Sequence, residues 1–171
     1  MNDDLYKGKY RTQTIRFQNW DYSSSGWYFV TICIENKENL FGYVMNKQVV
    51  LTELGHYAAA SWLAMERVFK VLKNDVWVIM PNHTHFLFKI DNPKEKYEFN
   101  EFGKTIKNSV SSIINHFKGR VTKYKNKENI EFEWQKGFYE HIVRDEYDFK
   151  RIQNYIVDNP TNWGKDKFYK K

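Results

Sequence analysis

The chain has 171 residues and a net charge of +6, and this length suits one ordinary domain better than two separate cores. Hydrophobic residues make up 42% of the sequence and charged residues 28%, which excludes a disordered chain, and the single cysteine, Cys33, cannot form an internal disulfide. No apolar run approaches the roughly 20 residues that cross a bilayer, and the N-terminus has no signal-peptide core, so we expect a cytoplasmic protein without a membrane partner.

The first half of the chain predicts strands on both sides of one helix. Aromatic and β-branched residues, bounded by turn residues such as Pro81 and Asn82, favour extended structure. The predicted strands are residues 27–34, one or two short strands within 40–51, 76–80 and 84–90. Thr52 is a typical N-cap, and apolar residues at spacings of three and four predict a helix from there to about Phe69.

The second half predicts a long helix, a strand and a final helix. Apolar residues recur with a helical period from residue 101 to about 123, and a strand is predicted within 138–143. The final helix is predicted over Glu146–Asp158, and Pro160 stops it.

The long helix and the residues after it carry the net charge of the chain. Residues 100–127 contain seven Lys or Arg and one acidic residue, and the rest of the chain is neutral. Such a segment is typical of a polyanion binder, because phosphates held by Lys and Arg release counterions. A solvated helix face explains the same pattern. The candidates for phosphate contacts are Lys104, Lys107, Lys118, Arg120, Lys123 and Lys125.

This order of elements predicts an α+β fold. A ferredoxin-like split βαβ sandwich fits best, with a central, largely antiparallel sheet, two long helices that cover one of its faces, and a further C-terminal helix. The predicted divisions of the chain are an N-terminal arm at 1–25, a single domain at 26–163 and a basic C-terminal tail at 164–171.

The segment His83-Thr84-His85 is the sharpest chemical feature. Residues two apart in a strand point to the same face, so both imidazoles should lie side by side, on the less apolar face of the strand. Paired imidazoles suit a divalent metal, with the remaining positions taken by a third protein ligand, water or a substrate oxygen. Ordinary hydrogen bonds at a strand surface are the alternative interpretation.

Tyr155 and Asn159 lie four residues apart in the final helix and therefore on one side of it. A tyrosine hydroxyl has a pKa of about 10 and attacks a phosphodiester only if a cation polarises the phosphate. A metal held by the two histidines would provide this cation, and Asn159 Oδ1 is a candidate third ligand. Alternatively, Tyr155 is an ordinary residue at the edge of the apolar face.

Taken together, these residues resemble a known family, the single-tyrosine HUH transposases of the insertion-sequence kind, and most closely their REP-associated relatives. The combination of M-P-N-H-T-H at 80–85 with Y-I-V-D-N-P at 155–160 is specific, although Thr84 stands where the family has a bulky apolar residue. The matching segments are residues 28–42, 76–90, 115–124, 134–146 and 152–163.

The resemblance implies a role for each candidate residue. His83 and His85 would bind a divalent metal, with Asn159 as the third ligand. Tyr155 would attack the scissile phosphate, which leaves a 5′-phosphotyrosine and a free 3′-hydroxyl. Tyr139, which we expect on a strand, is the competing nucleophile.

The resemblance also implies partners and a cofactor. The substrate would be single-stranded DNA with hairpin elements, and the basic residues of 100–127 would hold its phosphates. Mg²⁺ or Mn²⁺ is favoured over Zn²⁺, because no thiolate is near the motif and an amide oxygen completes the site. Relatives act as monomers or as dimers, so the resemblance allows a homodimer as well as a monomer.

Two other functions compete with this one. A domesticated nucleic-acid-binding protein without turnover would keep the fold and lose the reaction. A two-histidine phosphoesterase is disfavoured, because the second H-x-[ST] motif that it requires is missing.

Overall fold

The computed structural model describes residues 5–6, 10–11, 22–93 and 106–170. Most of the predicted N-terminal arm, the beginning of the predicted helix at 101–123 and the candidate Lys104 lie outside the described residues. Near the N-terminus, the short strands β1 (Leu5–Tyr6) and β2 (Tyr10–Arg11) pair with each other.

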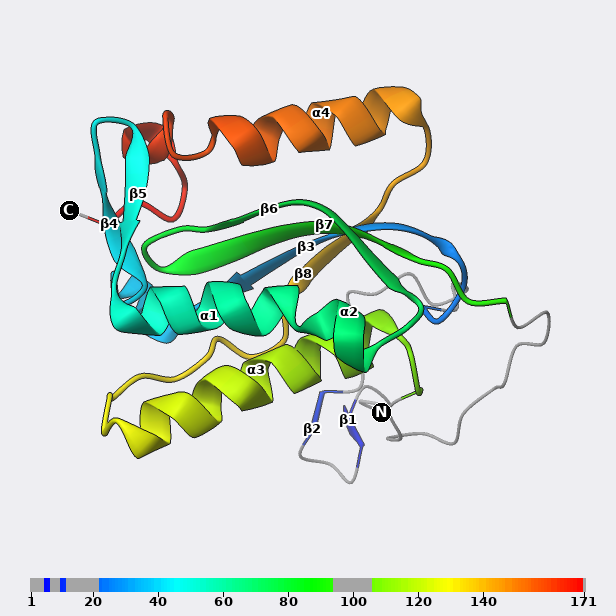
Figure 1. The fold of residues 1–171 in the computed structure, drawn as a ribbon, viewed down its shortest axis with the longest axis horizontal. Coiled ribbons are helices and arrows are strands. Elements are labelled where there is room, and N and C mark those ends of the chain that lie inside the picture. Colours follow the sequence, from blue (N-terminus) through cyan, green and yellow to red (C-terminus); the bar gives the residue numbers. More distant parts are fainter. Residues whose placement is uncertain (1–4, 7–9, 12–21, 94–105, 171) are drawn as a thin grey trace.

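A four-stranded antiparallel sheet forms the centre of the fold (Figure 1). In spatial order its strands are β6 (Leu72–Ile79), β7 (His83–Ile90), β3 (Gly26–Cys33) and β8 (Tyr139–Ile142). Helices connect β3 to β6 and β7 to β8, and neither pair is adjacent in the sheet. This is the split βαβ arrangement that the sequence predicts.

Helices cover both faces of this sheet (Figure 1). The helices α1 (Glu53–Leu63), α2 (Met65–Val68) and α3 (Val110–Lys127) lie on one face, as predicted for two long helices. The C-terminal helix α4 (Glu146–Asp158) lies on the other face. Side chains that alternate along the strands therefore pack against helices on both faces of the sheet, which gives one apolar layer on each side.

Several predicted boundaries were wrong, including the end of the long helix, which continues to Lys127. The helix expected from Thr52 to Phe69 is divided at Ala64, although Thr52 does cap α1. The long helix starts at Val110, because Asn108 has a left-handed backbone (φ 62°) and Ser109 caps the helix. The strand expected at 76–80 begins earlier, because its pairing with β7 continues across a bulge.

The predicted short strands form the hairpin of β4 (Gly42–Met45) and β5 (Gln48–Leu51). Asn46 and Lys47 turn the chain with positive φ angles of 51° and 65°, as two-residue hairpin loops require. Two short 3-10 helices, η1 (Glu35–Lys37) and η2 (Trp163–Lys165), follow β3 and α4.

Two buried clusters hold the layers together. The larger lies between the sheet and α1 and α3, where Trp62 stacks on Phe86 with ring centroids 3.7 Å apart. The smaller lies under α4 and consists of Phe29, Leu87, Ile152 and Ile156. This smaller cluster fixes α4 against the sheet beside the predicted histidine pair. Among the described helices, none has the length and apolarity to span a membrane.

Candidate metal and nucleophile site

His83 and His85 lie side by side on β7, as their spacing predicts, with their Nε2 atoms 3.0 Å apart. They point away from the larger core, on the face that α4 covers. This face is not open to solvent: His83 is 0% and His85 1% exposed. The phenyl ring of Phe168, from the segment after α4, lies 4.4 Å from the His83 ring.

The second nitrogen of each imidazole has a partner of its own. His83 Nδ1 donates a hydrogen bond to Asn82 Oδ1 at 2.9 Å, which leaves Nε2 of a neutral ring with its lone pair. His85 Nδ1 lies 2.8 Å from the hydroxyl of Thr31, which is its pairing partner on the neighbouring strand β3. Such contacts fix the orientation of a metal-binding histidine.

Both imidazoles are neutral at physiological pH. Burial lowers the pKa of His83 well below its usual value, and His85 lowers it further. Burial also lowers the pKa of His85, to about 3, and Lys167 adds to this effect. Each neutral ring keeps one lone pair, and when Nδ1 carries the proton in both rings, both Nε2 atoms can bind a cation.

Tyr155 lies on α4 with its hydroxyl oxygen 3.3 Å from His85 Nε2. Its ring packs edge-on against Phe29, and 39% of the side chain stays exposed. Burial raises the pKa of the Tyr155 hydroxyl, and Asp166 adds to this effect. The helix that carries Tyr155 is capped by Asp145 and held on the sheet by the smaller cluster.

Asn159 follows α4 directly and is 3% exposed. Its Nδ2 donates to Asp166 Oδ2 at 3.3 Å, and its buried Oδ1 has no hydrogen-bond partner among the described residues. The ligand atoms of His83, His85 and Asp166 all lie within 4.8 Å of one another. Two neutral imidazoles, a carboxylate and an unpaired amide oxygen fit a divalent cation.

Sequence reasoning missed Asp166. It belongs to the segment predicted as a basic tail, and only the fold of the chain after Pro160 brings it back to the histidines. No spacing rule connects it to the H-x-H motif.

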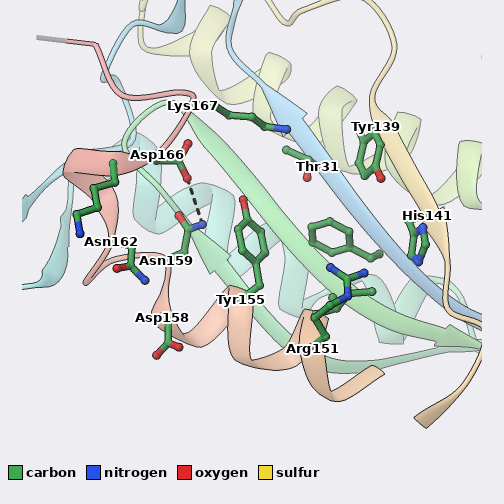
Figure 2. Close-up of a pocket in the computed structure, with 13 residues that line it drawn as sticks. Thr31, Tyr139, His141, Arg151, Tyr155, Asp158, Asn159, Asn162, Asp166 and Lys167 are labelled. Carbon is green, nitrogen blue, oxygen red and sulfur yellow. Dashed lines mark hydrogen bonds between the residues drawn. The ribbon is translucent and has the colours of Figure 1, made fainter. Parts of the chain in front are cut away.

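A pocket of about 530 Å³ opens beside Tyr155 (Figure 2). Its walls carry cationic side chains that were not predicted, namely Arg151, Lys165 and Lys167. Tyr139 also lines the pocket, from β8, and is 52% exposed. Tyr155, and not Tyr139, has its hydroxyl beside the histidine pair.

The predicted basic residues of α3 lie across the sheet from this pocket. Lys107, just before α3, and Lys123 are exposed. The ammonium groups of Lys118 and Lys125 donate to backbone carbonyls, of Gln135 and Gly137 and of Phe132 respectively. Arg120 is half-buried.

Comparison with known proteins gives three findings. The family model described as "Transposase IS200 like" matches residues 25–159. A protein of Haemophilus influenzae described as uncharacterized is 36% identical in an alignment of 171 positions that covers 95% of this chain and 95% of that protein. The solved structure of a REP-associated tyrosine transposase bound to a REP hairpin is 20% identical and has a TM-score of 0.63, covering 91% of this chain and 76% of that one. This last similarity shows the fold.

Proposed function

Because the chain belongs to the IS200-like transposase family, its role is transposase-like DNA processing, and we propose that it is a metal-dependent endonuclease and strand transferase acting on single-stranded DNA with hairpin elements. The observation that carries this proposal is the 3.3 Å separation between the hydroxyl oxygen of Tyr155 and His85 Nε2. The imidazole of His83 lies next to that of His85. A nucleophile and the donors for a divalent cation thus lie next to one another, the histidines buried and Tyr155 at the wall of the pocket.

In the proposed reaction, Tyr155 attacks the phosphorus of a DNA phosphodiester. The bond between its hydroxyl oxygen and phosphorus forms and the P–O3′ bond breaks, which gives a 5′-phosphotyrosine and a 3′-hydroxyl. The phenolic proton leaves to solvent through the open side of the pocket, and the departing 3′-oxygen takes up a proton. Attack by another 3′-hydroxyl reverses this step and joins two strands.

The cation would be held by His83 and His85, with the unpaired Oδ1 of Asn159 as an oxygen ligand. When bound, Mg²⁺ or Mn²⁺ supplies positive charge that polarises the phosphate and stabilises the charge developing on it. The protein itself keeps both imidazoles neutral by burying them, and it orients them through Asn82 and Thr31.

Two surfaces are suited to DNA phosphates. Arg151, Lys165 and Lys167 line the pocket and would hold the phosphates on either side of the scissile one. Lys107 and Lys123 would hold more distant parts of the strand. The solved relative with a REP hairpin supports hairpin DNA as the substrate.

Binding without turnover is the second candidate function. It is favoured by the burial of His83 and His85 under Phe168, because a phosphate oxygen reaches buried ligands only if that ring moves. Such a protein would bind hairpin DNA with the usual salt dependence, but neither metal nor Tyr155 would affect the affinity.

Covalent capture of the DNA distinguishes the two functions. Single-stranded hairpin oligonucleotides copied from the DNA that flanks the gene are incubated with wild type, Tyr155→Phe and Tyr139→Phe, with and without Mn²⁺. We expect an SDS-stable adduct that needs Mn²⁺ and is lost only in Tyr155→Phe. Loss only in Tyr139→Phe would move the nucleophile to β8, and tight binding without any adduct would favour the second function.

A further inference from the structure

The segment that follows α4 returns to the histidine pair and brings a carboxylate with it. Figure 2 shows Asp166, Asn159 and Tyr155 around one side of the pocket, with Asn159 bonded to Asp166. We propose that Asp166 is the anionic ligand of the metal site and that Asn159 holds its carboxylate toward the two imidazoles. The inference rests on the proposed function, which requires a divalent cation at His83 and His85.

Electrostatics gives the first argument. The ammonium groups of Lys167 and Lys37 lie 4.9 Å and 5.6 Å from the ring centroid of Phe168, which packs against His83, so their positive charges disfavour a cation between the imidazoles. Two imidazoles and an amide oxygen are uncharged and do not offset this repulsion. Within the described part of the chain, Asp166 is the carboxylate whose oxygen lies within 4.8 Å of both ligating nitrogens. Its negative charge would offset the lysines and favour Mg²⁺ or Mn²⁺, which prefer oxygen ligands.

The position of Asp166 gives the second argument. One carboxylate oxygen accepts a hydrogen bond from the backbone N–H of Phe168 at 2.7 Å, and the other accepts from Asn159 Nδ2 at 3.3 Å. Trp163 is 8% exposed and anchors the segment just before Asp166. After it, the carbonyl of Phe168 accepts from Asn82 Nδ2 at 2.9 Å. Both oxygens of the Asp166 carboxylate are thus fixed by hydrogen bonds. Such hydrogen bonds are typical of the residues that orient a metal ligand.

The unpaired oxygen of Asn159 is an independent observation. Asn159 is 3% exposed, and burying an amide oxygen without a partner costs free energy. A cation beside Asp166 would satisfy this oxygen. The same residue would then contribute its Oδ1 to the metal and its Nδ2 to the carboxylate.

Binding of Mn²⁺ to the full chain, measured by isothermal titration calorimetry without DNA, tests the proposal. The variants are Asp166→Asn, which keeps shape and removes the charge, and Asp158→Asn, which removes a charge from the same pocket outside the cluster. We expect Asp166→Asn to weaken Mn²⁺ binding by about 10-fold to 100-fold. Asp158→Asn should stay within about twofold of wild type, since screened surface charges interact weakly.

Two outcomes separate this inference from the function on which it rests. If Asp166→Asn binds Mn²⁺ as tightly as Asp158→Asn does while His83→Ala abolishes binding, Asp166 is not a ligand and the inference alone fails. If wild type binds no Mn²⁺, both the inference and the proposed function fail. Melting temperatures in EDTA establish that each variant is folded, and a Mn²⁺-induced rise that is smaller in Asp166→Asn alone supports the proposal independently.

Discussion

Asp148 connects β8 to the first turn of α4, and its substitution by asparagine tests how the helix that carries Tyr155 is held. One carboxylate oxygen accepts a hydrogen bond from His141 Nε2 at 2.6 Å and another from the backbone N–H of Arg144 at 3.3 Å. The other oxygen accepts from the guanidinium of Arg151. The Asp148 side chain is 14% exposed, so these contacts are partly shielded from water.

The expected loss of stability in Asp148→Asn follows from these contacts. A hydrogen bond to a charged group contributes about 1.5–3 kcal/mol, but asparagine keeps one oxygen that can accept. The Arg151 side chain is 55% exposed, so solvent screening limits its ion pair to less than about 1 kcal/mol. A negative charge in the first turn also interacts favourably with the helix dipole. We therefore expect Asp148→Asn to lower the free energy of unfolding by about 1–2 kcal/mol at pH 7.

The lowered pKa of Asp148 determines how its contribution to the free energy of unfolding changes with pH. Burial tends to raise the pKa of Asp148, but the hydrogen bonds from His141, Arg151 and the Arg144 backbone outweigh it and hold the pKa at about 2. In the unfolded chain the pKa is about 3.9. The stabilisation is therefore complete above the unfolded value and is lost as the pH falls through about 2.

Urea unfolding followed by tryptophan fluorescence measures this difference. The difference in free energy of unfolding between wild type and Asp148→Asn should be constant from about pH 7 to pH 5 and should become smaller below about pH 4. Asp158→Asn, the same change at the other end of α4, is the control and should stay within about 0.5 kcal/mol of wild type. A gap of the same size at pH 3 and pH 7, or no gap at pH 7, would refute the reasoning.

Removal of metal and of surface charge gives the remaining predictions. EDTA should lower the melting temperature of wild type and leave that of the double variant His83→Ala, His85→Ala unchanged; equal shifts would contradict the metal site. Without metal, the double variant should be less stable by roughly 2–4 kcal/mol, as measured by urea unfolding, because two buried side chains are removed. Lys107→Ala with Lys123→Ala should reduce the salt dependence of DNA binding by roughly one unit of slope per lost phosphate contact, and an unchanged slope would place the DNA elsewhere. Lys118→Ala should instead lower stability by about 1 kcal/mol in thermal unfolding, since its ammonium group donates to two carbonyls.

The strands and helices were largely predictable because their signals are local. The alternation of side chains along β7 placed both histidines on one face, and the period of α3 identified its apolar side. The start of α3 was not predictable from that period, because an apolar residue such as Ile106 fits the pattern although the chain turns at Asn108. At that position a single left-handed residue overrides the apolar spacing.

Burial and long-range contacts account for what the sequence did not reveal. Strand alternation identified the histidine face as the less apolar one, but it contains no information on what covers that face. Similarly, Tyr155 and Asn159 are related by helix spacing, whereas Asp166 reaches the site only through the fold of the segment after α4. Residues that depend on such a return of the chain have no signature at fixed spacing.

The covalent intermediate at Tyr155 is the central claim, and mass spectrometry of the trypsin-digested adduct tests it most directly. Tryptic cleavage places Tyr155 alone in the peptide 152–165 and Tyr139 alone in 137–144, so the mass of the attached nucleotides identifies the modified residue. After incubation of wild type with hairpin DNA and Mn²⁺, we predict the added mass on 152–165. Added mass on 137–144, or unmodified forms of both peptides although DNA is bound, would contradict the account.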